Sequence, residues 1–262
     1  MCQKIISDNV TAVLISSPSP SHPSTTLIDS VIDSFSNINQ LSTCRVIIVF
    51  DGYEVRENHE MKKGKVTSTM AENYELNILA IKEKYNDTDQ YHIHKSDTHR
   101  GFALCVKLGL ELCKTQYAMI VQHDRIFLPP PSSSRPTSSG SSSNNAQPPS
   151  LFDLIHLMET HTHTRYIGYP THTSCSHAAQ LLDRYYISCY TSYNTARIPI
   201  TNTLYFLQPL TFWFDSNHFI HIQRYLEIYQ PFINITDELK CILGSNGVKR
   251  LLLRRGDFIE VS

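Results

Sequence analysis

The sequence has 262 residues, which is long enough for one substantial α/β domain and does not require a second. Lys and Arg total 23 and Asp and Glu total 24, so the formal net charge of -1 gives no general electrostatic reason to expect a nucleic-acid partner. Seven cysteines, an odd number with no C-x-x-C pair, argue against a zinc ribbon and a fully paired secreted disulfide framework. We therefore expect free, mostly buried thiols.

Membrane insertion and secretion both leave sequence patterns that are not found here. The chain contains no apolar stretch near the roughly 20 residues that a membrane-spanning helix needs. Its first residues show no basic region followed by a long apolar core, the pattern of a secretory signal peptide. As written, the sequence predicts a cytoplasmic protein with no membrane span.

The first fifty residues predict a strand, a helix and a second strand. Residues 11–17 (TAVLISS) predict the first strand, and the proline-rich segment after it predicts a loop that ends in hydroxyl residues suited to cap a helix. The helical face that follows is formed by Leu27, Ile28, Val31, Ile32 and Phe35. Residues 45–50 (RVIIVF) predict a buried strand, which Asp51-Gly52 ends with a turn signal. This order indicates parallel strand pairing.

A later helix and strand lead into a group of polar residues. Apolar residues recur at three- and four-residue steps, the period of a helix with one buried face, at Phe102, Cys105, Leu108 and Leu112. Residues 117–121 (YAMIV) then predict a buried strand that ends at Gln122, His123 and Asp124. In open α/β sheets ligands bind beyond the carboxyl ends of the strands, so we expect a ligand or metal at these residues.

A serine- and proline-rich segment interrupts the chain. Residues 129–150 contain nothing that could form a core, and they predict a disordered surface insert within a single domain covering residues 1–262. The other expected elements are helices at residues 70–85, 151–160, 177–185 and 216–229, and strands at residues 91–94, 166–168 and 203–207.

Three carboxylates fall at the ends of expected strands or loops: Asp51, Asp124 and Asp215. Mg²⁺ prefers oxygen ligands and keeps waters and substrate phosphates around it, so one carboxylate at a strand end can recruit it. A neighbouring histidine also suits Mn²⁺. His123-Asp124 is therefore a candidate anchor for a divalent cation and a diphosphate. The alternative is that Asp124 pairs with Arg125 or caps a turn.

Histidines supply two further candidate sites. His99 and Arg100 directly precede Gly101 at an expected helix N-terminus, where free backbone N–H groups and the helix dipole favour an anion. We take both as candidate phosphate contacts, and the alternative is that they are solvated loop residues. His161 and His163 have metal-like spacing, but no acidic partner with metallohydrolase spacing accompanies them, so a zinc site is the weaker interpretation.

The order of these segments resembles nucleotide-sugar glycosyltransferases of the GT-A fold, and is closest in layout to family 2. There a second strand ends in an aspartate that contacts the nucleotide, a G-x-a-x-a-x-N-x-G helix follows, and an apolar strand runs into a metal-binding D-x-D motif. The corresponding segments here are TAVLISS, RVIIVFDG, GFALCVKLG and YAMIVQHD, within roughly residues 10 to 127. The resemblance implies an α/β, GT-A-like (Rossmann-like) fold with a mixed, mostly parallel sheet flanked by helices.

Three departures from the family pattern concern the site. Gln122 replaces the first aspartate of D-x-D, Lys107 stands where an asparagine is usual, and Ser and Pro follow the first strand instead of an aromatic-asparagine pair. The resemblance implies that Asp51 contacts the nucleoside. It also implies that Asp124, helped by His123, holds a divalent cation (Mn²⁺ or Mg²⁺) against the diphosphate.

The segment FWFDSNHF supplies the remaining implied roles. A late histidine can complete the metal site of GT-A enzymes, and His218 is the candidate here. In inverting enzymes an aspartate near the acceptor removes the hydroxyl proton as general base, and Asp215 is the candidate. The alternative is that Asp215 caps the N-terminus of a helix.

The function expected from this resemblance is transfer of a sugar from a UDP- or GDP-sugar donor to a hydroxyl acceptor on a glycan, lipid or protein. A second interpretation is a non-catalytic GT-A-like protein that binds nucleotide sugars or acts as a scaffold, which the loss of one D-x-D aspartate favours. A third, a histidine-rich metal hydrolase, predicts tightly bound zinc.

Overall fold

A six-stranded mixed sheet forms the centre of the structure, a computed structural model that describes residues 8–57, 64–85, 89–129, 150–162, 164–169, 196–200, 203–207 and 216–227. The strand order is β5-β2-β1-β6-β10-β7. The strands are β1 (Val10–Ser16), β2 (Arg45–Phe50), β5 (Tyr91–Lys95), β6 (Tyr117–Gln122), β7 (Tyr166–Gly168) and β10 (His218–His221). The first four are mutually parallel, and β10 lies antiparallel between β6 and β7. The expected mixed, mostly parallel sheet is confirmed.

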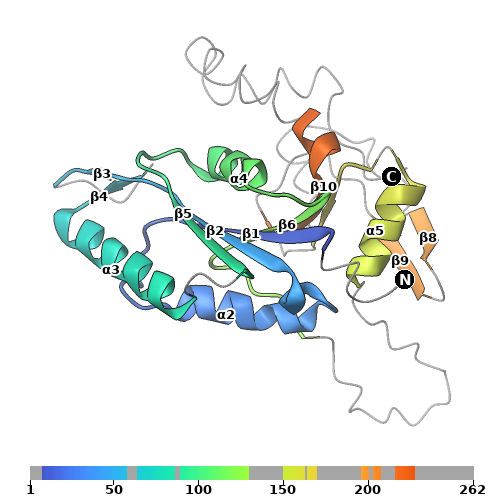
Figure 1. Cartoon of the computed structure of the whole chain (residues 1–262), viewed down its shortest axis with the longest axis horizontal. Helices are drawn as coiled ribbons and strands as arrows, with labels where there is room; N and C mark the ends of the chain where they lie inside the picture. Colours follow the sequence, from blue (N-terminus) through green and yellow to red (C-terminus); the bar gives the residue numbers. More distant parts are fainter. Residues whose placement is uncertain are drawn as a thin grey trace, which may run out of the picture.

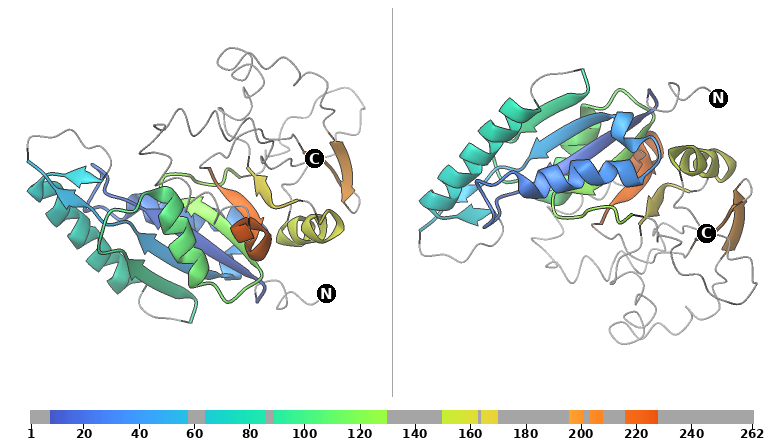
Figure 2. Two further views of the ribbon diagram at one scale, coloured as in Figure 1. Left: turned by 90° about the horizontal axis from the view of Figure 1, so that it is seen from above. Right: turned by 90° about the horizontal axis from the view of Figure 1, so that it is seen from below.

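Helices cover both faces of this sheet (Figure 1). Helices α2 (Thr26–Ser34), α3 (Ser68–Lys84) and α5 (Leu151–Thr160) share one buried apolar cluster, and α4 (Phe102–Glu111) belongs to a second cluster. Figure 2 shows α4 in front of the sheet in one view and α2 and α3 in front of it in the opposite view. No helix in the described part of the chain is long and apolar enough to cross a membrane.

Side-chain alternation explains why both faces need a cover. Ala12 and Leu14 of β1 pack in the cluster with α2 and α3, whereas Val13 and Ile15 pack in the cluster with α4. Successive residues of a strand point to opposite faces, so a continuous apolar run requires burial on both sides. The runs TAVLISS, RVIIVF and YAMIV are therefore central strands, as expected.

Shorter elements lie outside the main sheet. Strands β3 (Glu54–Val55) and β4 (Lys65–Val66) pair in parallel, and β8 (Ala196–Ile200) pairs antiparallel with β9 (Thr203–Leu207). Single 3₁₀ turns, η1 (Phe35–Asn37) and η2 (Leu41–Thr43), connect α2 to β2. The insert residues 130–149 and the helix expected at residues 177–185 lie outside the described residues.

The prediction of a helix over residues 216–229 is wrong in its first part. Its first residues form β10, where His218 pairs opposite Ile120 and Phe219 opposite Met119, and helical structure begins only at Ile222. His218, Phe219 and Ile220 are all buried because they lie between β6 and β7. A short apolar run fits a strand or a helix equally well in sequence, and the open edge of β6 decided the outcome.

Candidate functional site

The candidate site is the carboxyl edge of the sheet, where the parallel strands β1, β2, β5 and β6 end. Backbone hydrogen bonds continue past the strands and hold the following loops together. They run from Asp51 N to Ser16 O (2.8 Å), from Ser96 N to Phe50 O (2.8 Å) and from His123 N to Ile15 O (3.0 Å). The loops that the sequence singled out therefore meet at one edge.

Asp51 is buried at the end of β2 and is 2% exposed. Its Oδ1 accepts a hydrogen bond from Arg100 N at 2.7 Å, and its Oδ2 accepts one from Gly101 N at 2.9 Å. His99 Nδ1 lies 2.9 Å from the same Oδ2. A carboxylate is stabilised at a helix N-terminus by the free N–H groups and the helix dipole, so Asp51 serves as an internal anion for α4.

The structure thus brings three predicted site residues, Asp51, His99 and Arg100, into direct contact. The backbone N–H groups of Arg100 and Gly101, just before α4, bind the Asp51 carboxylate, and phosphate contact by His99 and Arg100 stays a prediction. The left-handed Gly64 (φ +73) lies against the His99 ring, where a Cβ atom would approach His99 Cγ to 2.2 Å. Direct contact of Asp51 with a nucleoside stays a prediction, and it would have to compete with these internal bonds.

Arg100 is exposed and is fixed at one nitrogen. Its Nε donates to Ser96 Oγ at 2.8 Å, and Ser96 Oγ in turn donates to Thr98 O at 2.9 Å. The two terminal guanidinium nitrogens make no hydrogen bond or ion pair with other residues in the described part of the chain. Those nitrogens are available for an external anion.

His123 and Asp124 follow β6 in different environments. His123 is partly buried, and its Nδ1 lies 3.3 Å from Ile15 O. Burial lowers the His123 pKa, while the neighbouring Asp124 charge and the Ile15 carbonyl act to raise it. The Asp124 side chain is 53% exposed and lies 4.0 Å from Arg125 Nε. An exposed pair at that distance is weak, so the carboxylate remains accessible to a ligand.

Asn217, at the start of β10, holds the loop that carries Asp124. Its Oδ1 accepts from Gln122 N at 3.2 Å and its Nδ2 donates to Arg125 O at 2.8 Å. No local sequence pattern indicates this role, because the two hydrogen bonds span more than ninety positions. The only sequence signal is its place in the FWFDSNHF segment.

His22 and Tyr74 also lie at the candidate site, although no local sequence pattern indicates them. The His22 ring stacks on Tyr74 with centroids 5.0 Å apart, and its Nδ1 accepts from Ser19 N at 3.2 Å. Burial, together with the nearby His123, lowers the His22 pKa to about 4. Tyr74 donates to Asp51 O at 3.0 Å. The two rings therefore close the space between the loop after β1 and the end of β2.

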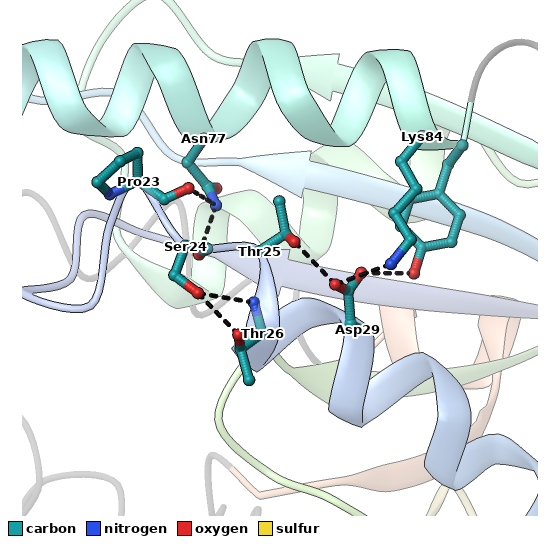
Figure 3. A network of polar contacts seen from close by, with 8 residues as sticks. Pro23, Ser24, Thr25, Thr26, Asp29, Asn77 and Lys84 are labelled. Carbon is teal, nitrogen blue, oxygen red and sulfur yellow. Dashed lines mark hydrogen bonds and ion pairs between the residues drawn. The ribbon is translucent and has the colours of Figure 1, made fainter.

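The loop after β1 is fastened to α3 and α2 (Figure 3). Asn77 Nδ2 donates to Ser24 O at 2.9 Å, and Asp29 accepts from Thr25 Oγ1 at 2.7 Å and pairs with Lys84 Nζ at 2.9 Å. Burial acts to raise the Asp29 pKa, but hydrogen bonds from Lys84, Thr25 and Tyr85 bring it below its ordinary value. These contacts hold the loop that borders the candidate site against α2 and α3.

His218, a predicted metal ligand, is fully buried in β10 between the rings of Tyr166 (4.8 Å) and Tyr225 (5.8 Å). Its Nδ1 lies 2.6 Å from Ser216 O. Burial lowers the His218 pKa to about 4, although the bond to the Ser216 carbonyl acts to raise it. His218 and the exposed Asp124 therefore occupy different environments. Among the described residues, no group of three or more His, Cys, Asp or Glu side chains is arranged to hold a metal ion.

Asp215, the predicted general base, lies outside the described residues, as does His163. Residues 218–221, expected in the helix that Asp215 would cap, form β10 instead. Cys44, Cys105 and Cys113 are free thiols, as expected. Burial raises the pKa of Cys44 to about 12, so this thiol is a packing group.

Comparisons with known proteins give likeness of structure only. No family model and no curated protein matches the sequence. The chain is similar in structure to S. aureus TarS 1–349 in complex with UDP-GlcNAc, with a TM-score of 0.41 and 12% identity over 82% of this chain and 45% of TarS. The mannosyltransferase PcManGT from Pyrobaculum calidifontis, in complex with GDP-Man and Mn²⁺, gives a TM-score of 0.41 and 8% identity over 86% and 46% of the two chains.

A third similar structure is the 4-diphosphocytidyl-2C-methyl-D-erythritol synthase of Anaerococcus prevotii. It has a TM-score of 0.41 and 11% identity over 89% of this chain and 79% of that chain. Against another TarS chain the match covers 59% of this chain and 20% of TarS. This chain thus spans less than half of TarS and of PcManGT.

Proposed function

We propose that this protein is a GT-A-type glycosyltransferase that moves a sugar from a nucleotide-diphosphate donor to a hydroxyl acceptor. The observation that carries the proposal is the exposed carboxylate of Asp124, at the carboxyl end of the central strand β6. It shares the edge with exposed Arg100, and ligands of open α/β sheets bind at this edge. The order of elements over residues 10–127 is also the one that the GT-A resemblance implies.

The donor set fits a divalent cation shared with the substrate. One exposed carboxylate, without a cluster of three ligands among the described residues, suits Mg²⁺ or Mn²⁺ that arrives with a diphosphate and retains waters. When bound, such an ion would neutralise charge on the departing diphosphate. Asp124 is the proposed ligand, with His123 beside it, and His218 would join only if its ring left its buried position.

Arg100 is the proposed contact for the diphosphate. Its guanidinium presents a planar fork of donors that matches phosphate oxygens, and Ser96 fixes the Nε end. Asp51 would act on the donor through this loop, since it holds the backbone of Arg100 and Gly101. Pre-positioned cationic groups stabilise charge that develops on a leaving group.

Asp215 is proposed as the general base for an inverting reaction. It would remove the proton from the acceptor hydroxyl while the sugar leaves the diphosphate. Glycans, lipids and proteins all offer such hydroxyl groups, and the acceptor class is open.

A non-catalytic nucleotide-sugar-binding protein is the second candidate. Gln122 in place of an acidic residue leaves the β6 end with one carboxylate, which favours weak metal binding and slow turnover. This candidate predicts donor binding without release of the nucleotide.

The test measures unfolding of the protein with UDP-GlcNAc and GDP-Man, each with and without Mn²⁺. A ligand that binds only the native state at about 100 times its Kd stabilises it by about 2.7 kcal/mol. We expect Mn²⁺-dependent stabilisation that Asp124→Asn removes. The matched control is Asp33→Asn, an exposed aspartate on α2, which should keep the full effect.

Release of UDP or GDP then separates the two candidates. Metal-dependent nucleotide release that is lost in Asp124→Asn supports the transferase, and binding without release supports the binding protein. Stabilisation that is equal in Asp124→Asn and Asp33→Asn would overturn the proposed site.

A further inference from the structure

A hollow of about 610 Å³ lies at the amino edge of the sheet, at the opposite ends of the strands from the candidate site. It is lined where the central strands begin, by Thr11 near the start of β1, Arg45 at the start of β2 and Thr115 just before β6. This volume is within the range of pockets that hold small molecules. No residue assigned above to sugar transfer lines it.

Arg45 is the most unusual group in the hollow. Its side chain is partly buried, and its Nε is shielded from solvent without a hydrogen-bond partner among the described residues. It also forms no ion pair within that part of the chain. A ligand cannot reach the shielded Nε, so the two terminal guanidinium nitrogens are the donors left to meet one, and such a pair fits the paired oxygens of an oxyanion.

A second cation lines the same hollow. Lys114 is exposed and has no carboxylate partner among the described side chains. Three hydroxyl groups of the lining are already engaged, because Thr11 Oγ1 and Thr115 Oγ1 lie 2.8 Å apart, Thr115 donates to Tyr117 O at 2.9 Å and Thr43 donates to Gln40 O at 2.9 Å. The two cations are the charged donors that an anion in the hollow would meet.

Two carboxylates, Asp8 and Asp89, also line the hollow, but both are exposed. Water and salt screen the exposed charges of Asp8, Asp89 and Lys114 alike, whereas the partly buried Arg45 keeps a stronger field. The least screened charge in the lining is therefore positive.

We propose that this hollow binds a tetrahedral oxyanion, the phosphate or sulfate group of a small molecule, between Arg45 and Lys114. The bound oxygens meet the Arg45 guanidinium at the inner end, and Lys114 closes over them from the surface. This site is separate from sugar transfer and does not depend on the proposed function.

The test is a titration of isotope-labelled protein with inorganic phosphate and with sulfate, up to about 20 mM and at constant ionic strength, followed by amide NMR. We expect saturable shifts at Thr11, Arg45 and Thr115. Arg45→Gln and Lys114→Gln should each raise the Kd about tenfold or more. The matched control, Arg56→Gln, changes an exposed arginine already paired with Glu54 and should leave the Kd unchanged.

Arg45→Gln is a change at a partly buried residue and can prevent folding. Lys114 is exposed, so Lys114→Gln should fold and still tests the proposal. Shifts that grow without saturation, or a Kd that is equal in Lys114→Gln and Arg56→Gln, would overturn the proposal. Acetate provides the remaining comparison: affinity equal to that of phosphate would contradict a tetrahedral oxyanion. Donor binding is measured with Asp124→Asn, so the two proposals succeed or fail separately.

Discussion

Asp51 illustrates how one buried side chain can organise a site. Both carboxylate oxygens accept backbone N–H groups of the two residues just before α4, and His99 lies against one of these oxygens. The sequence indicated an aspartate at a strand end and an anion-binding helix N-terminus as two separate features. In the folded chain each satisfies the other, because the end of β2 and the start of α4 lie side by side.

Asp51→Asn should destabilise the protein by about 1 to 3 kcal/mol, because an amide has one acceptor oxygen and its NH₂ group would face a backbone donor. Urea unfolding measures the change. Asp33→Asn serves as the exposed control and should change stability by about 0.5 kcal/mol or less. Equal stability of the two variants would show that the contacts of Asp51 contribute nothing.

At the scale of elements, loops held by distant residues shape the carboxyl edge. Asn217 fixes the loop after β6, and Asn77 fixes the loop after β1. Gly64, just before β4, lies against the His99 ring. Each contact joins segments far apart in the chain, so local sequence patterns could not predict it.

Gly64→Ala should destabilise the protein by more than its backbone strain alone. Gly64 and Gly101 both have a positive φ, +73 and +78, and a substitution at such a position strains the backbone by about 1 to 3 kcal/mol. A Cβ at Gly101 meets nothing within 4 Å, whereas a Cβ at Gly64 would displace the His99 ring from Asp51. Chemical denaturation of Gly64→Ala with His99 present and in a His99→Ala background isolates the steric part, and equal losses in the two backgrounds would contradict the contact with His99.

At the scale of the whole molecule, buried histidines link stability to pH. The pKa values of His22 and His218 are each lowered from 6.5 to about 4 in the folded state, chiefly by burial. Between these values the unfolded chain binds more protons than the native one, so stability falls as the pH falls. Asp29 acts only at lower pH, since its lowered pKa contributes stability that is lost as the pH falls below its ordinary value of 3.8.

The free energy of unfolding should therefore decrease between pH 7 and pH 5. His218→Phe removes one of the two groups, and it should flatten this dependence whatever its effect on stability at pH 7. Urea unfolding at both pH values provides the measurement. An unchanged slope in His218→Phe would show that His218 does not titrate as a buried neutral group.

The sequence by itself determined the alternation of strands and helices, because continuous apolar runs and three- to four-residue periods are local consequences of burial on two faces or one. It also located Asp51 and Asp124 at the ends of strands, and His99 and Arg100 just before the N-terminus of a helix. Tertiary structure decided what is non-local: that residues 218–221 complete the sheet as β10, that Asp51 binds the start of α4, and that Arg45 and Lys114 share a hollow. Each depends on which segments become neighbours, and that depends on the packing of the whole chain.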